Sequence, residues 1–477
     1  MACPLVVDLD GTLIRSDLLV ECGLRYLRRS PLEAMRPLLW LGQGKALLKT
    51  RLAERGEVDV TTLPYEPAVL ALIDEARRDG RPVVLATASH VSLADAVAEH
   101  LGCFDEIVAS TETTNLAGGL KRDLLVERFG ERGFDYAGNA SADLPVWRAA
   151  RHAYVVNAGE GLLRRACAQG NVAGVLGAAA DRRGQAWRDW LSALRVHQWA
   201  KNILLFVPLL AAHVFDDPSR LLAVFAAFVL FGQCASSVYL LNDLLDLEED
   251  RRHPRKRERP FAAGKLPVAA GLLVSPLLLL PAFGLAALLL PWPFVAAMGG
   301  YYLLTLAYSL HVKRMIGLDV IALAVLYTFR IVAGAAAAQV PLSFWILAFS
   351  MFMFLSLAML KRYAELVDAR ASGADVGGRG RGYLPSDLEM LGPLGAAAGY
   401  LSVLVLALYI HDPATAAAYA RPELIWMACP LLLFWLTRMW MLAHRGEMHD
   451  DPMVFALRDR TSIAIGVAFL LIFGVAA

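Results

Sequence analysis

Charge and cysteine are scarce in this sequence of 477 residues. Only 19% of the residues are charged, whereas 57% are hydrophobic, and the formal net charge is +1. This composition excludes a disordered chain and a basic nucleic-acid-binding arm, because neither class carries so many apolar residues. A net charge near zero also provides no overall field to attract a polyanion, so we expect no nucleic-acid partner. The length suggests two or three domains.

The six cysteines are scattered and form no Cys-x-x-Cys pair. Their spacing indicates neither a disulfide framework nor a zinc site, and it suits a reducing cytoplasm. The N-terminus also lacks the apolar core of a secretory signal peptide. The short apolar run Pro4–Val7 leads directly into acidic residues, so we expect no signal peptide.

The charged residues are unevenly distributed. Residues 1–195 contain 24 Lys and Arg and 25 Asp and Glu, about a quarter of that region. Residues 196–477 contain 22 and 20, or about 15%. Because long apolar runs fill the second region, we predict a soluble N-terminal domain joined to a polytopic membrane domain.

The first region alternates short apolar runs with helical stretches, which predicts an α/β domain with a parallel, Rossmann-like sheet. We predict this domain at residues 1–180. The predicted strands are Leu5–Val7, Pro82–Ala86, Glu106–Ala109, Tyr136–Ala137 and Ala153–Val156. Residues 15–80 carry no strand signal and predict a helical insertion after the first strand.

The second region predicts an all-α membrane domain of about nine helices at residues 196–477. Its apolar spans are 200–214, 221–241, 268–290, 292–310, 317–337, 342–360, 391–410, 423–443 and 461–477. Alternate gaps between the spans carry 17 Lys and Arg, whereas the opposite gaps carry only Arg220 and Arg421. The positive-inside rule then predicts a multi-pass protein of the inner (plasma) membrane. The N-terminal domain and motif-bearing loops would be cytoplasmic, and the C-terminus would lie on the other side.

A junction at residues 181–195 connects the two regions. Residues 186–195 can form an amphipathic helix that places Trp187, Trp190 and Leu194 in the interfacial zone of the bilayer. A plain linker helix explains the same pattern equally well.

The first predicted strand ends in Asp8-Leu9-Asp10-Gly11-Thr12. Parallel sheets bind ligands at this edge, where Asp8 can attack phosphorus while Asp10 serves as acid and base. A metal ion would let the carboxylate approach a phosphate dianion. Alone, such a pair could equally be a turn or a helix cap.

Further motifs follow in order, and together they resemble the haloacid dehalogenase superfamily of phosphatases. Thr87 matches its phosphate-binding hydroxyl, and Lys121 matches the lysine that neutralises nucleophile and phosphate. The sequence from Gly138 to Asp143 matches its acidic metal motif. The resemblance implies one Mg²⁺ held by Asp8, Asp10, Asn139 and Asp143, with residues 15–80 as a substrate-selecting cap. Asn139 replaces an acid of that motif and lowers the expected metal affinity, so an active phosphatase and a degenerate regulatory domain both remain open.

A second acidic motif follows the second apolar span. The spacing i, i+3, i+7 would place Asp243, Asp246 and Asp250 on one helical face. Three acids at a membrane boundary repel each other, and one or more Mg²⁺ ions would relieve that repulsion while leaving positions for diphosphate oxygens. A solvated helix end is the alternative. The basic run His253–Pro260 follows at once and could hold the same polyphosphate or act as a membrane anchor.

This arrangement resembles the UbiA superfamily of intramembrane prenyltransferases, which implies nine helices around a cavity with acidic cytoplasmic loops. Where many members carry a second Asp-rich motif, this chain has Lys361-Arg362-Tyr363-Ala364-Glu365-Leu366. That departure resembles the decaprenyl-phosphate phosphoribosyltransferase branch, together with the segments Arg195–Asn202, Leu318–Val320, Phe329–Gly334 and Asp451–Asp459. The resemblance implies phosphoribosyl diphosphate and a polyprenyl phosphate lipid as substrates, in cell-wall or glycolipid biosynthesis.

The predicted substrate contacts are polar residues of these segments. They are Arg195, Gln198, Lys201, Asn242, Lys256, Arg259, Arg330, Lys361, Arg362, Tyr363 and Glu365. Lys201, Lys361 and Arg362 would hold phosphate, whereas Tyr363 and Glu365 would orient the ribose. Arg330 lies within an apolar span, where it could face phosphate in the cavity or pair with an acid such as Asp319.

Three functions follow from these patterns. The first is transfer of phosphoribose to polyprenyl phosphate, with the N-terminal domain removing the 5-phosphate of the product. The second is an aromatic prenyltransferase with a prenyl diphosphate donor and a degenerate N-terminal domain. The third is a lipid-binding scaffold with both sites inactive. A homo-oligomer is left open.

Overall fold

The computed structural model describes residues 2–30, 33, 35–177, 182–371, 382–412, 419–448 and 451–477. The chain divides into two compact units. The first unit contains Met1–Leu194 and Leu240–Val274, and the second contains Arg195–Tyr239 and Ser275–Ala477. The loop that carries the second acidic motif therefore packs within the first unit. The boundary predicted between residues 180 and 181 lies outside the described residues.

A six-stranded parallel sheet with the order β3-β2-β1-β4-β5-β6 forms the centre of the first unit. Its strands are β1 (Leu5–Val7), β2 (Val83–His90), β3 (Glu106–Ser110), β4 (Asp135–Gly138), β5 (Ala153–Val156) and β6 (Val172–Leu176). The predicted parallel α/β fold is confirmed. The sequence pattern missed β6, an edge strand in which alternate residues are exposed. It also ended β2 too early, because that strand continues past a register shift between Ala86 and His90.

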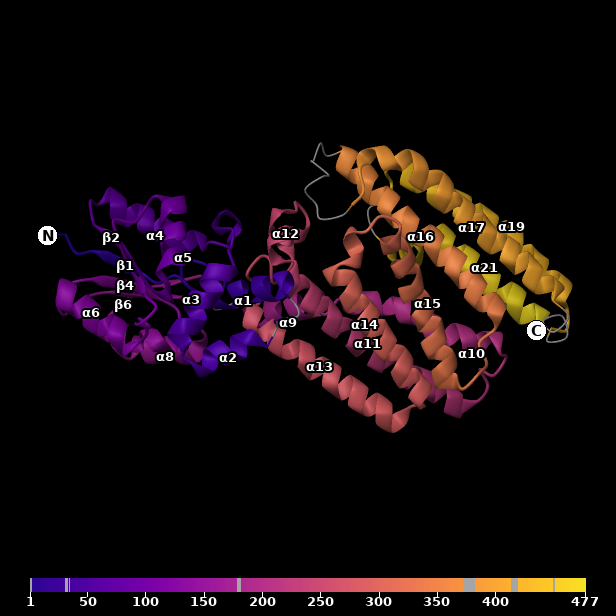
Figure 1. Ribbon diagram of the computed structural model, residues 1–477, viewed down its shortest axis with the longest axis horizontal. Coiled ribbons are helices and arrows are strands. Elements are labelled where there is room, and N and C mark those ends of the chain that lie inside the picture. The colour runs from indigo at the N-terminus through magenta and orange to yellow at the C-terminus, as the bar shows by residue number, and fades with distance from the viewer. Residues whose placement is uncertain are drawn as a thin grey trace. The chain divides into compact units, whose positions relative to one another are not determined.

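Helices cover both faces of this sheet (Figure 1). On one face, Leu5 and Val7 pack against α4 (Pro67–Arg78) and α5 (Val91–Leu101). On the other face, Val6 packs with residues of α6 (Gly119–Phe129), α7 (Leu144–Ala149) and α8 (Glu160–Cys167). Successive strand residues point to opposite faces, so the apolar run Leu5–Val7 contributes to both cores.

The described part of residues 15–80 is mostly helical, as the absence of strand signals predicted, although α4 packs on the sheet and its assignment to a cap remains a prediction. The helices are α1 (Leu18–Arg29), α2 (Arg36–Gly42), α3 (Lys45–Arg55) and α4. Helix α9 (Arg182–Ala193) follows the sheet, and Trp190 contacts Phe261 edge to face while Trp187 is exposed.

The remaining helices make this a multi-pass membrane protein. In the described residues, seven helices are long and apolar enough to cross a bilayer. Five of them are α11 (Pro218–Leu245), α13 (Val268–Leu289), α14 (Trp292–Leu310), α15 (Leu318–Ala338) and α16 (Phe344–Ala371). The other two each include a short 3₁₀ start: Pro385–His411, which contains α17 (Leu388–His411), and Pro422–His444, which contains α19 (Ala428–His444). A bent pair, α20 (Pro452–Arg458) and α21 (Arg460–Ala476), gives an eighth span if counted as one.

Where about nine spans were predicted, the described residues contain seven or eight helices of that length and composition. The predicted span 200–214 consists of the 3₁₀ segment Val196–Phe206 and the short α10 (Val207–Ala211). These elements are too short to cross a bilayer, since about 20 residues are needed. Pro208 is the second residue of α10, and its missing N–H suits the first turn of a helix better than an interior position.

Small residues allow close packing inside the second unit. Gly334 of α15 leaves no room for a side chain, because a Cβ there would lie 2.1 Å from the Leu205 carbonyl oxygen. Helix–helix contacts in membranes rely on such small residues, since lipid gives no hydrophobic drive for association. This packing keeps Arg330, on the same helix, away from lipid.

Candidate active sites

The two aspartates of the first motif lie where β1 ends, between the ends of β2 and β4. Asp8 is buried, and its Oδ1 accepts a hydrogen bond of 2.7 Å from Lys121 Nζ. The Lys121 ammonium also lies 3.0 Å from the Tyr136 hydroxyl oxygen. The structure thus brings together the predicted nucleophile and the predicted neutralising lysine, which are 113 positions apart in sequence.

Asp143 holds the loop that follows β4 through hydrogen bonds. Its Oδ2 accepts the N–H groups of Asn139 and Ala140 at 3.0 and 2.9 Å. Its Oδ1 accepts the Tyr136 hydroxyl at 2.8 Å. Burial raises the pKa of Tyr136 well above its ordinary value, so the phenol remains a donor. Asp143 therefore orients the loop that presents Asn139.

Asp10 occupies a different environment two residues further on. Its Oδ1 accepts the Leu18 N–H at 2.9 Å, and its Oδ2 accepts the Ser89 hydroxyl at 2.5 Å. Burial, with a smaller contribution from nearby Asp17, raises the pKa of Asp10 to about 7. Burial raises the pKa of Asp8 only to about 6, because Lys121 opposes the shift. A carboxyl group that titrates near neutral pH suits the acid and base role predicted for Asp10.

Asn139 packs directly against the loop after Asp10. A Cβ on Gly11 would lie 2.0 Å from Asn139 Nδ2, and the Thr12 hydroxyl donates to Asn139 Oδ1 at 3.2 Å. An amide oxygen has two lone pairs, so one can still face a cation beside Asp8. The oxygens of Asp8, Asp10 and Asn139 therefore fit Mg²⁺, with less negative charge than an all-acidic set.

Thr87 is fully buried within β2 rather than at its end. Its Oγ1 accepts the Ser89 N–H at 3.0 Å. The predicted contact between Thr87 and phosphate remains a prediction, and the present contacts make Thr87 a support for Ser89.

The second acidic motif does not form one continuous helical face. Helix α11 ends at Leu245, and α12 (Leu247–Arg252) begins after Asp246, whose φ and ψ of −101° and 13° are not helical. Asp243 and Asp250 are buried together around Arg259, whose Nη1 lies 3.1 Å from Asp243 Oδ1 and 2.6 Å from Asp250 Oδ2. Asp246 lies apart from this pair and faces Arg28 at 3.8 Å.

This buried cluster contains two carboxylates and one guanidinium, and the Lys256 charge also acts on Asp250. Burial, with a smaller contribution from Asp243, raises the pKa of Asp250 to about 6 against the lowering effects of Arg259 and Lys256. Asn242 precedes Asp243 in the sequence, and its Oδ1 is buried and has no hydrogen-bond partner among the described residues. Carboxylate and amide oxygens are ligands that Mg²⁺ accepts, so Asn242, Asp243 and Asp250 fit a cation.

The described residues contain no group of three or more His, Cys, Asp or Glu side chains arranged to hold a metal. The predicted cluster of Asp243, Asp246 and Asp250 is therefore not preassembled, because the helix breaks at Asp246 and Arg259 binds the other two. For a metal ion to bind here, Asp243 and Asp250 must turn away from Arg259, or Arg259 must contact the bound diphosphate as well as the carboxylates.

In the second unit, two predicted phosphate-binding lysines converge on one carboxylate. Lys201 Nζ and Lys361 Nζ lie 2.9 and 3.1 Å from Asp451 Oδ2. The Tyr327 hydroxyl donates to Asp451 at 3.2 Å. This lysine cluster brings together residues 250 positions apart and keeps a net positive charge.

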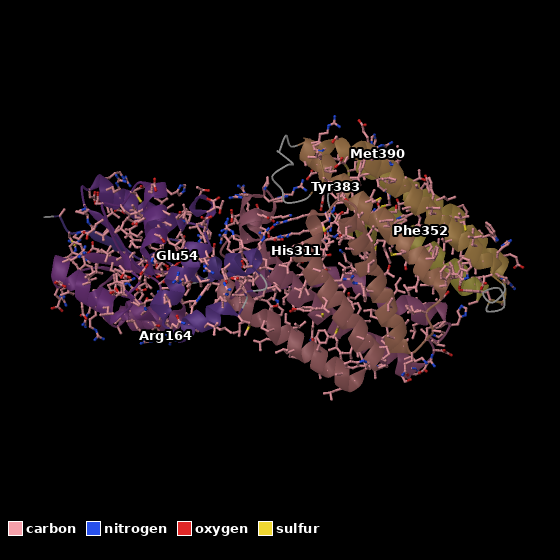
Figure 2. The ribbon with its side chains drawn as sticks, in the orientation of Figure 1. Glu54, Arg164, His311, Phe352, Tyr383 and Met390 are labelled. Atoms are coloured by element: carbon pink, nitrogen blue, oxygen red, sulfur yellow. The ribbon has the colours of Figure 1, made fainter. Side chains whose placement is uncertain are left out.

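Arg362, the neighbour of Lys361, is buried in a separate network. Its guanidinium donates to Asp319 at 2.6 Å, to Glu365 at 2.6 Å and to the Tyr308 hydroxyl at 2.5 Å. Tyr383, labelled in Figure 2, donates to the other Asp319 oxygen at 2.5 Å. Each nitrogen of the Arg362 guanidinium therefore donates a hydrogen bond within this network, which connects neighbouring helices. The predicted contact between Arg362 and phosphate would require some of these hydrogen bonds to break.

Arg330 does not pair with Asp319, which was one of its two predicted roles. Its guanidinium donates to Asn202 Oδ1 at 3.1 Å, to the Leu326 carbonyl at 2.8 Å and to the Tyr301 hydroxyl at 3.1 Å. It also lies over the rings of Phe231, Tyr301 and Tyr327. Among the described residues no carboxylate lies within salt-bridge distance of Arg330, so its charge is balanced by oxygens and aromatic faces.

The other predicted contacts are distributed around these clusters. Arg195 lies over the Tyr239 ring, and the Gln198 N–H donates to the Arg195 carbonyl at 2.7 Å. Tyr363 bonds His444 Nδ1 at 2.8 Å and lines a cavity of 670 Å³ with Arg370 and Glu389. Lys256 lies in the 3₁₀ turn Lys256–Glu258 of the basic run.

Sequence reasoning missed several residues of these sites. Ser89, Tyr136 and Tyr327 carry no motif signal, because a single hydroxyl on a strand or helix is normally structural. Asp451 stands in a segment that was noted for its resemblance, but no role was assigned to it. Its contact with Lys201 depends on tertiary structure alone.

Comparison with known proteins adds two family assignments. The UbiA prenyltransferase family matches residues 203–470. The chain belongs to the UbiA family. The haloacid dehalogenase-like hydrolase family matches residues 5–148, so this UbiA protein carries a second enzyme-type domain. Both families generally depend on Mg²⁺.

Three relatives illustrate how this UbiA protein is built. An uncharacterized protein, y4nM, of Sinorhizobium fredii is 40% identical over 97% of this chain and 89% of its own. Nodulation protein NoeC of Azorhizobium caulinodans is 37% identical over 59% of this chain and 93% of its own. The decaprenyl-phosphate phosphoribosyltransferase of Mycolicibacterium smegmatis is 31% identical over 60% of this chain and 91% of its own. Among solved structures, a UbiA homolog from Archaeoglobus fulgidus bound to GPP and Mg²⁺ is 15% identical over 60% of this chain and 99% of its own, with a TM-score of 0.46.

These comparisons confirm the UbiA and haloacid dehalogenase-like resemblances and a membrane enzyme of the transferase type. They do not test the individual site residues, the sidedness or the domain boundaries, which remain predictions.

Proposed function

We propose that this protein transfers phosphoribose from phosphoribosyl diphosphate to a polyprenyl phosphate in the membrane. The observation that carries the proposal is the lysine cluster of Lys201, Lys361 and Asp451, in a chain 31% identical to a decaprenyl-phosphate phosphoribosyltransferase over 60% of its length. A second acidic cluster is absent from the described residues at this position. Two lysines at this position suit direct binding of a phosphate group better than they suit binding of a second metal ion.

The acidic segment would receive the diphosphate of the donor. Asn242, Asp243 and Asp250 would hold Mg²⁺, which neutralises the diphosphate as the bond to the anomeric carbon breaks. Arg259 already lies between the two carboxylates, and its guanidinium would turn to the departing diphosphate oxygens.

The lysine cluster would receive the phosphate of the second substrate. A lipid phosphate already carries negative charge and needs no strong base to attack the ribosyl carbon. Lys201 and Lys361 would orient this phosphate once it replaces the Asp451 carboxylate between them. The lipid chain would extend among the apolar helices of the membrane domain.

The N-terminal domain would then remove the 5-phosphate of the lipid-linked product. Asp8 is held by Lys121 for attack on phosphorus, and Asp10 can protonate the leaving alcohol and later activate water. Mg²⁺ at Asp8, Asp10 and Asn139 would screen the phosphate charge from the nucleophile.

A donor assay tests the transferase. Purified full-length protein in lipid nanodiscs is given polyprenyl phosphate, Mg²⁺ and phosphoribosyl diphosphate labelled in the ribose. We expect label in the lipid fraction and its loss in the Asp243→Asn variant. Transfer only from a prenyl diphosphate donor to an aromatic acceptor would replace the proposal with the prenyltransferase alternative.

A further inference from the structure

Helix α1 of the N-terminal domain contacts the acidic segment, residues 242–252, directly. Arg25 forms an ion pair with Glu248, and Arg28 forms one with Glu249. Arg28 Nη1 also donates to the Leu245 carbonyl at 3.1 Å, where α11 ends. One side of α1 is thus matched in charge to the helix break that separates Asp243 from Asp250 (Figure 1).

A buried ion pair anchors this contact. Arg251 Nη1 and Nη2 lie 2.9 and 2.7 Å from the two Glu21 oxygens. The two side chains are only 5% and 6% exposed. Arg251 also donates to the Ala262 carbonyl at 3.2 Å, and Ser16 donates to Glu21. Because neither charge of this bidentate pair can reach water, removing one partner leaves the other buried and unpaired.

The same helix begins at the phosphatase site. The Leu18 N–H, at the first position of α1, donates to Asp10 Oδ1 at 2.9 Å. Asp10 also accepts the Ser89 hydroxyl at 2.5 Å. Twelve residues therefore connect Asp10 at one end with Arg28 at the other. A helix is rigid over such a length, so a shift of its first turn moves the contacts along its side.

We propose that α1 is a positioning element for the transferase, which fixes the acidic segment through Glu21, Arg25 and Arg28 and links its geometry to the occupancy of Asp10. This inference rests on the proposed function for the role of the acidic segment, but the contact itself does not. A phosphate group or cation at Asp10 competes for the oxygen that holds Leu18. The two sites then influence each other's ligands, and the coupling is reciprocal for binding.

Charge exchange tests the positioning role in the full-length protein. We expect Glu21→Gln to raise the KM for phosphoribosyl diphosphate about tenfold while hydrolysis of a small phosphomonoester changes less than twofold. Arg251→Glu should do the same, and the double variant Glu21→Arg with Arg251→Glu should restore the KM. The control is Arg29→Gln on the same helix, because Arg29 forms an ion pair at 3.3 Å with Glu57, an exposed residue outside the acidic segment.

Hydrogen exchange separates this inference from the proposed function. In the wild type, amides of residues 246–252 should exchange slowly, and Glu21→Gln should speed their exchange at least tenfold while Arg29→Gln does not. Adding beryllium fluoride with Mg²⁺, a phosphate mimic for Asp8, should change this exchange in the wild type but not in Glu21→Gln.

The outcomes are distinct. If the wild type transfers no phosphoribose but the exchange pattern holds, the proposed function fails and the positioning role of α1 stands. If Glu21→Gln and Arg29→Gln give equal exchange rates, the positioning proposal is overturned whatever the transferase does. If beryllium fluoride leaves exchange unchanged in the wild type, the link to Asp10 is wrong.

Discussion

The two acidic motifs of this chain differ in how their charges are arranged. At the end of β1, Asp8 faces one lysine and Asp10 faces two neutral donors, so each carboxylate has its own environment. In the acidic segment, Asp243 and Asp250 share a single arginine. The first arrangement gives the two carboxylates different surroundings, whereas the second places both carboxylates around one guanidinium.

This difference shows what preorganisation depends on. Strand β1 is fixed between β2 and β4, so the positions of Asp8 and Asp10 are set by the sheet. The acidic segment has a helix break at Asp246 and forms ion pairs with α1. We therefore expect the first motif to tolerate changes elsewhere and the second to be sensitive to them.

The largest expected effect separates the two motifs by chemistry. Asp8→Asn removes the attacking oxygen and should lower phosphate release by on the order of 10³-fold or more. Asp243→Asn should instead abolish lipid labelling and leave hydrolysis of a small phosphomonoester intact. Paired assays on the two variants check this, and the loss of both activities in either variant would contradict the separation.

Substitutions of the neighbouring residues Lys361 and Arg362 should differ in whether they lower activity or stability. Arg362→Gln leaves Asp319 buried without its guanidinium and should cost about 3 kcal/mol or more of stability. Lys361→Gln breaks a more exposed pair, with Lys361 30% exposed. It should lower transferase activity with little change in stability. Thermal unfolding in detergent measures the first effect, and labelled transfer measures the second. A Lys361→Gln variant that unfolds as early as Arg362→Gln would remove the distinction.

Restoring an acid at Asn139 sharpens the comparison between the metal sites. Asn139→Asp adds a charged oxygen beside Asp8 and should lower the Mg²⁺ concentration for half-maximal phosphate release by about tenfold. The Mg²⁺ dependence of lipid labelling should stay unchanged, since the acidic segment is untouched. Magnesium titrations of both activities check this. A parallel shift in both curves would indicate that one ion population serves both reactions.

A smaller effect concerns the pH dependence of the N-terminal domain. Hydrogen bonds and charge from Arg151 and Arg81 outweigh burial and lower the pKa of Asp135 below its ordinary value of 3.8. The folded state therefore binds that proton more weakly than the unfolded state, and stability is lost as pH falls through the folded pKa. Asp135→Asn should lower stability at neutral pH by about 2 kcal/mol and flatten its loss in acid. Calorimetry from about pH 3 to pH 7 measures this; an unchanged acid slope would contradict it.

Much of the fold could be predicted from the sequence. Leu5–Val7 and Ala153–Val156 were located to the residue, because short apolar runs between helices identify buried parallel strands. The exposed edge strand β6 lacks such a run and was missed. The segment 200–214 is apolar enough to suggest a span. Its 3₁₀ conformation and the short helix around Pro208 instead pack against α15, a tertiary contact that the local sequence does not indicate.

The sites were predicted less completely. Asp8, Asp10 and Lys121 were found because their order along the chain is specific. The periodicity of Asp243, Asp246 and Asp250 suggested one helical face, yet the helix breaks at Asp246, where Asp246 faces Arg28 and the other two face Arg259. Asp451 was unassigned because nothing local in the sequence indicates that Lys201 and Lys361 will meet it.

The most direct test of the account is the mass of the lipid product made from phosphoribosyl diphosphate and polyprenyl phosphate with Mg²⁺. We predict that the wild type forms a ribosyl lipid without the 5-phosphate and that Asp8→Asn accumulates the same lipid with that phosphate retained. Identical lipid products from both proteins would contradict a phosphatase step in this chain, and no ribosylated lipid from either would contradict the transferase.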